Sequence, residues 1–342
     1  MTEEEARALL EEQWGRLART PVPEARKVRA VELQGFRRRN NLGITVAVDT
    51  DGRRHLLVPV TSRTSVRSEL DGPVLKLRKR SLEDAETFRW YADLGCEAPD
   101  FDDLFTRLCS DVLLATEANP GQPLKTLYRV LDRWKDLFRS DRPPLGPDQL
   151  VGIFGELTVL ARLLTKDPSA HRLWLGSEGH RHDFSSRDRA VEVKAGTHTE
   201  GRRPRIHGLD QLEAPPRGTL SLAWIRLSRT PAGAGTSVPE LVDRVLEACD
   251  DDTALLRRLA QLGYSPTDTA HYRNHCFTVA EERWYHVDAN FPGLTGRHLR
   301  EAGIPVSVVD VEYSIDLSGE LPAPMSPDEI DHTVDSMLQE PQ

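Results

Sequence analysis

The stretch HDFSSRDRAVEVK, residues 182–194, carries the strongest structural signal in the chain. Two short apolar segments flank the polar turn SSRDR, which predicts a pair of neighbouring β-strands. Side chains two positions apart on a strand point to the same face, so Glu192 and Lys194 project together while Val193 faces the core. If the two strands are neighbours, Asp183 approaches Glu192 from the adjacent strand. The stretch therefore predicts two converging carboxylates beside a lysine.

Two close carboxylates repel each other, and one of them raises its pKa, unless a divalent cation shares them. Mg²⁺ is the expected ion because it prefers oxygen ligands and is commonly held by one or two carboxylates plus a substrate phosphate; Mn²⁺ is expected to substitute for it. Hydrolysis of a phosphodiester requires such an ion. Lys194 is then expected to orient the water that attacks the phosphate, to accept its proton indirectly, or to stabilise charge on the transition state. The competing interpretation is a surface hairpin on which Glu192 and Lys194 simply face water.

The helix that precedes this stretch carries a lone acidic residue on an apolar background. PDQLVGIFGELTVLARLLT, residues 147–165, has helical periodicity and stops before Asp167-Pro168. Glu156 within it is either a further metal ligand or part of the polar edge of an amphipathic helix, beside Gln149 and Arg162. The residues alone leave both interpretations open.

The wider chain divides at Asp141-Arg-Pro-Pro144, where a helical pattern breaks. Before the break, a helix, several strand-like segments and two further helices indicate an accessory α+β domain, residues 1–144. After it, helices alternate with strands, and TLSLAWIRLS, residues 219–228, is typical of a central strand covered on both faces. We therefore expect an α/β domain over residues 145–318, followed by an acidic, proline-containing tail, residues 319–342, that is poorly ordered.

Composition and charge set the remaining limits. The net charge of −9 would argue against a nucleic-acid partner, but residues 311–342 hold eight acidic residues and no Lys or Arg, so the rest of the chain is close to neutral. No long apolar run is present, the N-terminus is acidic, and the four cysteines form no CxxC pair, so a cytoplasmic protein without a membrane segment is expected. No P-loop, GxGxxG or GxSxG motif supports an ATPase, a dinucleotide enzyme or an α/β-hydrolase.

Four segments together resemble a bacterial family of unknown function described as PD-(D/E)XK nucleases, within the restriction-endonuclease-like superfamily. They are GIFGELTVL at 152–160, HDF at 182–184, AVEVK at 190–194 and IHGLDQL at 206–212. The resemblance extends roughly from Leu124 to Tyr313, with weaker similarity in the N-terminal strands. His182 stands where the family name has proline, a position that supplies no metal ligand.

The resemblance implies an α/β fold with a restriction-endonuclease-like mixed sheet flanked by helices. In that superfamily the centre is formed by an acidic residue of the first helix, an aspartate at the start of the hairpin and the E-x-K, which correspond here to Glu156, Asp183, Glu192 and Lys194. The implied function is that of a metal-dependent endodeoxyribonuclease. Family members look like components of restriction-like or phage-defence operons, which implies ATPase or methyltransferase partners. The alternative is a non-catalytic DNA-binding or scaffolding subunit that keeps the nuclease fold.

Residues near the E-x-K are candidates for substrate contact or support. The loop after it is predicted to contact DNA phosphates, the alternative being an exposed basic turn. Its candidate residues are Arg202, Arg203, Arg205 and His207. Gln211 is either a residue that supports the site or an ordinary helix-surface glutamine, and His182 either touches substrate or metal or is simply packed. Double-strand cutting usually requires two centres, so a homodimer is expected by geometry.

Overall fold

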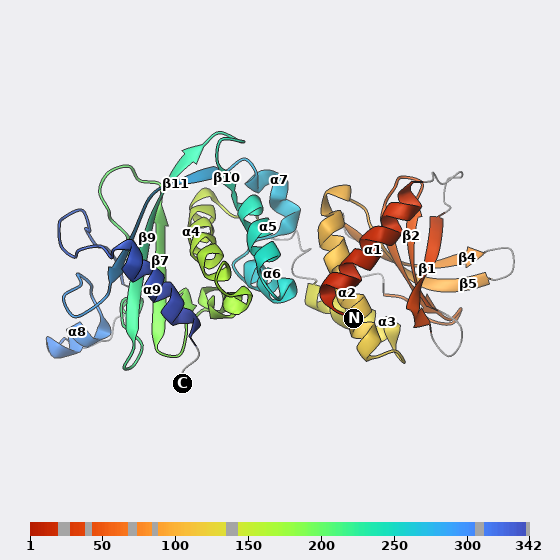
Figure 1. Cartoon of the computed structure of the whole chain (residues 1–342), viewed down its shortest axis with the longest axis horizontal. Coiled ribbons are helices and arrows are strands. Elements are labelled where there is room, and N and C mark those ends of the chain that lie inside the picture. Colours follow the sequence, from red (N-terminus) through yellow and green to blue (C-terminus); the bar gives the residue numbers. More distant parts are fainter. Residues whose placement is uncertain are drawn as a thin grey trace. The chain divides into compact units, whose positions relative to one another are not determined.

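The computed structural model describes residues 1–19, 28–37, 43–67, 74–83, 88–134, 143–304 and 311–339. Contacts divide the chain into two compact units, Met1–Arg139 and Ser140–Gln342 (Figure 1). This division lies near the boundary expected at residue 144. The break at Asp141-Arg142 falls outside the described residues.

The first unit is built on a five-stranded antiparallel sheet in the order β1-β2-β3-β5-β4. Its strands are β1 (Val28–Arg37), β2 (Gly43–Asp49), β3 (Arg54–Val60), β4 (Leu75–Glu83) and β5 (Phe88–Cys96). Its helices are α1 (Glu3–Ala18), η1 (Pro99–Phe101), α2 (Asp102–Ala118) and α3 (Pro123–Trp134). Helix α1 begins with a capping box in which Thr2 and Glu5 satisfy each other's backbone N–H groups.

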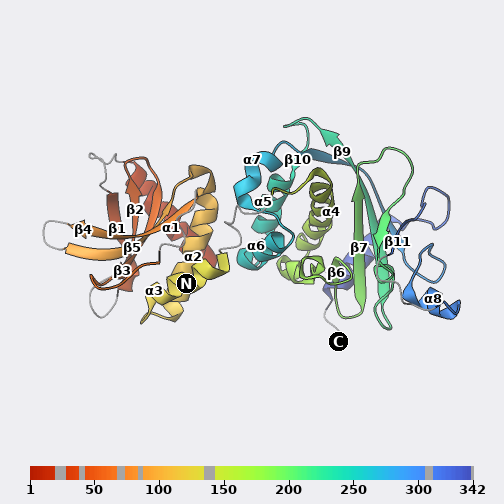
Figure 2. The same cartoon turned by 180° about the vertical axis from the view of Figure 1, so that it is seen from behind.

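The second unit contains a five-stranded mixed sheet in the order β10-β11-β9-β7-β6. Its strands are β6 (Phe184–Ser185), β7 (Arg189–Gly196), β9 (Thr219–Thr230), β10 (Thr236–Ser237) and β11 (Cys276–His286). Strands β7 and β9 run parallel, while the other neighbours pair antiparallel. This mixed α/β arrangement is compatible with the restriction-endonuclease-like fold that the resemblance implies (Figure 2).

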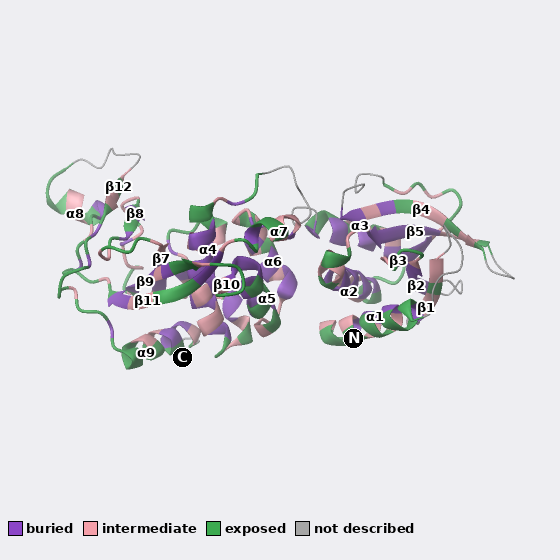
Figure 3. Cartoon of the chain, turned by 90° about the horizontal axis from the view of Figure 1, so that it is seen from above, coloured by how far each residue is buried: buried purple, intermediate pink, exposed green. Residues whose placement is uncertain are grey.

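Helices and short helical turns surround this mixed sheet. They are α4 (Pro147–Leu164), η3 (Pro168–Leu173), η4 (Gly176–Glu178), α5 (Val238–Ala248), α6 (Asp252–Gln261), η5 (Pro266–Asp268), α7 (Thr269–Tyr272), α8 (Gly296–Glu301) and α9 (Pro327–Leu338). Helix α4 packs on β7 and on α5, and buried residues are concentrated along it (Figure 3). Each fully buried Leu or Val side chain contributes about 1.5–3 kcal/mol, so α4 is a principal part of this core. No helix within the described ranges has the length and hydropathy required to span a membrane.

Gly155 sets how closely α4 approaches β7. A Cβ atom added at this glycine would lie 2.5 Å from Ala195 Cβ and 3.5 Å from Val193 Cγ1, so any side chain would force the helix away from the strand. The contact also shows that Val193 and Ala195 face α4. Glu192 and Lys194 therefore face the opposite side of the sheet, as the alternation of the sequence predicts.

A small second sheet pairs β8 (Arg205–His207) with β12 (Glu312–Ser314). It belongs to a hydrophobic cluster that packs on Leu222 and Trp224 of β9 and Tyr285 of β11. The other members of the cluster are Ile206, Leu212, Phe291, Ile315 and Leu317. This cluster covers part of the sheet face that carries Glu192 and Lys194, because Leu222 and Trp224 are their register partners on β9.

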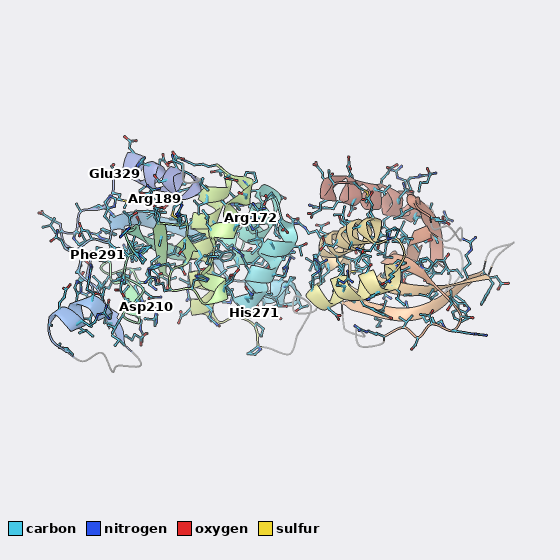
Figure 4. The ribbon with its side chains drawn as sticks, turned by 90° about the horizontal axis from the view of Figure 1, so that it is seen from below. Arg172, Arg189, Asp210, His271, Phe291 and Glu329 are labelled. Carbon is cyan, nitrogen blue, oxygen red and sulfur yellow. The ribbon has the colours of Figure 1, made fainter. Side chains whose placement is uncertain are left out.

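The prediction of a poorly ordered tail was wrong for residues 327–338, which form α9. A capping box between Ser326 and Glu329 starts the helix, and acidic residues in its first turn favour the helix dipole. Val334 and Met337 are buried where α9 contacts α4 and β7, and Arg189 Nη1 donates to the Ser336 carbonyl at 2.8 Å. Figure 4 labels Arg189 and Glu329 on these neighbouring elements. The acidic composition of the tail hid an amphipathic helix.

Candidate active site

Asp183 is fixed against the edge of β7 at the point where its pairing with β6 stops. Its Oδ2 accepts a hydrogen bond from Val193 N at 2.7 Å, and its carbonyl accepts from Leu175 N at 2.8 Å and Gly176 N at 3.0 Å. A Cβ atom added at Gly176 would lie 2.8 Å from Asp183 Oδ1, so only glycine permits this close approach. Backbone hydrogen bonds on both sides therefore hold the carboxylate in place.

Glu192 and Lys194 lie on one face of β7, as the sequence predicts. Lys194 Nζ is 2.8 Å from Glu192 Oε1, in an ion pair rather than an aligned hydrogen bond. The Glu192 side chain is only 1% exposed, and its Oε2 has no hydrogen-bond partner among the described residues. A buried carboxylate oxygen without a donor is costly, which marks this position as one where a further ligand would be favourable.

Glu156 reaches the same place from α4. Its Oε2 accepts a hydrogen bond from Trp174 Nε1 at 2.7 Å, and the close contact at Gly155 brings its helix against β7. The predicted alternative neighbour, Arg162, instead pairs with Glu282 at 3.0 Å. The charges of Asp183 and Glu192 both act on the Glu156 carboxyl group, so this helix residue lies near the hairpin carboxylates although Glu192 itself points away from α4.

Burial and mutual repulsion raise the pKa values of this group. The pKa of Glu192 rises to about 8, first because of burial and then because of the Asp183 charge, while Lys194 opposes the rise. The pKa of Glu156 also rises to about 8, with burial again the largest cause and the Asp183 charge next. Burial raises the pKa of Asp183, against the effect of its hydrogen bond from Val193. One lysine does not compensate three ionised carboxyl groups, so Glu156 and Glu192 largely keep their protons near neutral pH unless a cation neutralises the cluster.

The chemistry of these residues fits a hard divalent cation. Within the part of the chain that the structure describes, no group of three or more His, Cys, Asp or Glu side chains is placed to hold a metal ion. Two carboxylates suffice for Mg²⁺, which keeps several waters, and Asp183 and Glu192 provide such a pair. The unpartnered Glu192 Oε2 and the raised pKa values show that a cation here would relieve repulsion. The arrangement can therefore hold a metal ion beside an ammonium group.

Comparison with known proteins agrees with this geometry. The family model described as "Putative PD-(D/E)XK family member, (DUF4420)" matches residues 10–318. The chain belongs to this family. No curated protein and no solved structure matches this chain. Membership indicates nuclease chemistry, and PD-(D/E)XK nucleases generally use divalent metal ions.

Gln211 lies beside the E-x-K lysine of this PD-(D/E)XK family member. Its Oε1 accepts hydrogen bonds from Lys194 Nζ and from His207 N, both at 2.9 Å. The first contact holds the ammonium group, and the second anchors Gln211 to β8. The structure therefore places this residue at the site and not on a helix surface.

His182 is packed beneath the segment that carries Gln211. Its side chain is 2% exposed, and burial lowers its pKa to about 4, with the positive charge of Arg181 acting in the same direction. Hydrogen bonds with the backbone of Glu213 and Gln211 oppose that shift. His182 is thus neutral at physiological pH, and its contacts are those of a residue that positions Gln211.

The basic loop lies beyond the carboxylates, and each predicted DNA-contacting residue has an acidic partner. Arg203 Nε is 3.0 Å from Asp316 Oδ2, and Arg202 Nη1 is 3.2 Å from Glu281 Oε1. The Glu312 carboxylate pairs both with Arg205 and with His207, whose Nε2 is 2.8 Å away. Among the described residues, these four side chains pair with Glu281, Glu312 and Asp316 rather than with Asp183 or Glu192.

Three residues that position the site were not predicted. Gly155 and Gly176 allow close approaches to β7 and to Asp183, and Trp174 donates to Glu156. Gly155 did carry a sequence signal, because a glycine inside an apolar helix often marks a close contact. Gly176 and Trp174 act through contacts with residues distant in sequence or across a turn, which no local pattern identifies.

Proposed function

We propose that the protein is a divalent-metal-dependent endodeoxyribonuclease that hydrolyses DNA in a restriction-like or phage-defence system. Mg²⁺ is the proposed ion, and Mn²⁺ is expected to replace it. The observation that carries the proposal is the convergence of Asp183, Glu192 and Glu156 beside Lys194, because one lysine cannot neutralise all three carboxyl groups when they ionise. Family membership supports the same chemistry.

Each residue has a distinct proposed role. Asp183 and Glu192 would hold the ion, which supplies an activated water and neutralises the scissile phosphate when bound. Lys194, held by Gln211, orients the water or stabilises charge on the phosphate. Glu156 is a further ligand or a general base.

A plasmid assay tests this proposal. Purified wild-type protein should nick or linearise supercoiled DNA with Mg²⁺ or Mn²⁺ and be inactive in EDTA. Lys194→Ala and Asp183→Asn should lack this activity, while Lys166→Ala, which removes an exposed lysine paired with Asp335, should retain it. DNA binding without cleavage under any condition would instead support the non-catalytic binding subunit.

The assembly is a separate part of the proposal. Cutting both strands of a duplex usually requires two centres, so we propose a homodimer, with ATPase or methyltransferase partners supplying steps for which this chain has no motif. Analytical ultracentrifugation with and without duplex DNA measures whether the protein is a homodimer. A monomer that linearises plasmid in a single binding event would contradict the dimer.

A further inference from the structure

The sheet face that carries Glu192 and Lys194 continues beyond them into a set of arginines. In the register of the sheet, Lys194 lies opposite Trp224 on β9, and Trp224 lies opposite Arg283 on β11. Residues paired in this way point to the same face. The row through Lys194 therefore ends in an arginine.

The next row along the same face is Gly196, Arg226 and Glu281. A Cβ atom built on Gly196 would meet no atom within 4 Å, so no side chain covers the sheet at this position. Arg226 stacks over the Trp224 ring at 5.1 Å, and its Nη2 donates to the Gly201 carbonyl at 2.8 Å. The guanidinium is thus held in a fixed position on β9, opposite the open position at Gly196.

Three arginines surround the single carboxylate of Glu281. Its Oε1 is 2.9 Å from Arg283 Nε and 3.2 Å from Arg202 Nη1, and its Oε2 is 3.4 Å from Arg226 Nη1. The group carries three positive charges against one negative charge. Arg283 is 40% exposed and pairs only with Glu281 among the described residues, so the far end of its guanidinium is available to a ligand.

We propose that Arg283 binds a backbone phosphate of the DNA strand next to the phosphodiester that is hydrolysed. Arg202 and Arg226, whose guanidinium groups are held by backbone carbonyls and Glu281, add positive charge beside it. Gly196 lies two residues beyond Lys194, which corresponds to roughly 7 Å along the strand, with about 5 Å more to β9. This separation places the arginines away from the phosphate that the metal would hold and toward a neighbouring phosphate of the same strand. Glu281 holds the guanidinium groups close together before DNA arrives. The inference rests on the proposed nuclease function.

The excess charge distinguishes this group from the predicted basic loop. Asp316 neutralises Arg203, and Glu312 neutralises Arg205 and pairs with His207, so little unpaired positive charge remains there. Only Arg202 belongs to both sets. A polyanion gains more from a cluster with surplus positive charge on the catalytic face than from exposed, individually paired residues.

Binding of a fluorescently labelled DNA duplex to the full chain in EDTA, measured over a range of salt concentrations, tests the inference without cleavage. Arg283→Ala should weaken binding roughly threefold or more and lower the slope of log affinity against log salt by about 1. Arg283→Lys should retain most of the affinity. Arg257→Ala on α6, which removes an exposed arginine elsewhere, is the matched control and should resemble wild type.

Glu281→Gln separates a phosphate site from an ion cluster that only stabilises the fold. If the arginines bind phosphate, removing the carboxylate should tighten DNA binding; if the cluster is structural, folded Glu281→Gln should bind no better than wild type. The inference would be overturned if folded Glu281→Gln bound DNA no better than wild type, or if wild type did not bind duplex. It would also be overturned if Arg283→Ala bound DNA with the same affinity as Arg257→Ala. Loss of plasmid cleavage alone would not, because binding is measured separately, and thermal unfolding verifies that each variant is folded.

Discussion

Each unit of the molecule buries charged side chains within its sheet, but the two clusters are built in opposite ways. In the first unit, Asp93 is fully buried, with Oδ1 2.7 Å from His55 Nδ1 and Oδ2 2.5 Å from Arg80 Nε. These partners lower the pKa of Asp93 although burial acts to raise it, and Asp93 and Asp49 raise the pKa of His55 against the effect of its burial. Opposite charges compensate one another there.

In the second unit, like charges meet. Glu156, Asp183 and Glu192 share one lysine, and their pKa values are raised. A compensated buried cluster stabilises its fold, whereas an uncompensated one is costly unless a ligand neutralises it. The contrast indicates that the first cluster is structural and the second functional, and it yields different expectations for the same kind of substitution.

The largest expected effect is on cleavage by Glu192→Gln. Loss of a metal-binding carboxylate should reduce the cleavage rate by ~10³-fold or more. The free energy of unfolding without metal should stay the same or increase above pH 8, because the amide carries no buried charge. Plasmid nicking and urea titration measure the two quantities. A strong loss of stability would show that this cluster is structural after all.

Asp93→Asn should have the reverse profile. It leaves His55 and Arg80 without their buried carboxylate, so the first unit should lose about 3–5 kcal/mol of stability. Asp51→Asn, at an exposed position of the β2–β3 turn, is the control and should change stability by less than about 0.5 kcal/mol. Thermal and urea unfolding of both variants provide the measurement, and equal stability of the two would break the comparison.

The pH dependence of stability should separate the clusters further. The folded chain keeps protons on Glu156 and Glu192 up to about pH 8, whereas the unfolded chain releases them near 4.5. The folded state therefore binds more protons between these values, so metal-free stability should fall by a few kcal/mol as pH rises through this window and level off above it.

A double variant isolates this effect from that of His55. Because its pKa is raised, His55 contributes stability that is present below pH 6.5 and is lost as pH rises through its folded value. Wild type and the Glu156→Gln/Glu192→Gln variant both contain His55. Subtracting their unfolding free energies at each pH therefore cancels its contribution. At pH 8 the double variant should be the more stable protein, and added Mg²⁺ should reduce the gap by stabilising wild type. A gap that does not change with pH would contradict the raised pKa values of Glu156 and Glu192.

Smaller effects are expected from glycines that make room for each cluster. Gly155→Ala should cost about 1–3 kcal/mol and also lower cleavage, because it displaces Glu156. Gly95→Ala, whose Cβ would lie 2.9 Å from the His55 ring, should cost stability without lowering cleavage by the folded protein. Gly152→Ala has open space and should be neutral or stabilising by up to about 1 kcal/mol. Circular dichroism melts combined with the plasmid assay distinguish the three variants.

Local pattern was sufficient for the central part of the site. The alternation of AVEVK placed Glu192 and Lys194 on one face, and the register of β7 with β9 agrees with that. The continuous apolar run at residues 219–228 lies within β9, the central strand of the mixed sheet. In each case, the order of apolar and polar residues along a single strand is enough to predict which side chains face the core.

Other features depend on contacts that no local pattern encodes. The approach of Glu156 requires Gly155 to touch Ala195, forty positions further along the chain. Arg226 and Arg283 reach the sheet face of Glu192 and Lys194 only through the pairing of β7, β9 and β11, so their positions follow from sheet register. Helix α9 was not predicted because prolines among acidic residues are typical of a disordered tail, whereas the helix depends on the spacing of Val334 and Met337.

The docking of α9 has a mechanical consequence. Arg189, which donates to the Ser336 carbonyl, begins β7 only three residues before Glu192, so the final helix is tied to the strand that carries a proposed metal-binding carboxylate. The family match ends at residue 318, before this helix starts. A protease cut between residues 318 and 327 would release the tie while leaving every proposed metal ligand in the chain, so limited digestion offers a way to loosen the strand without altering its chemistry.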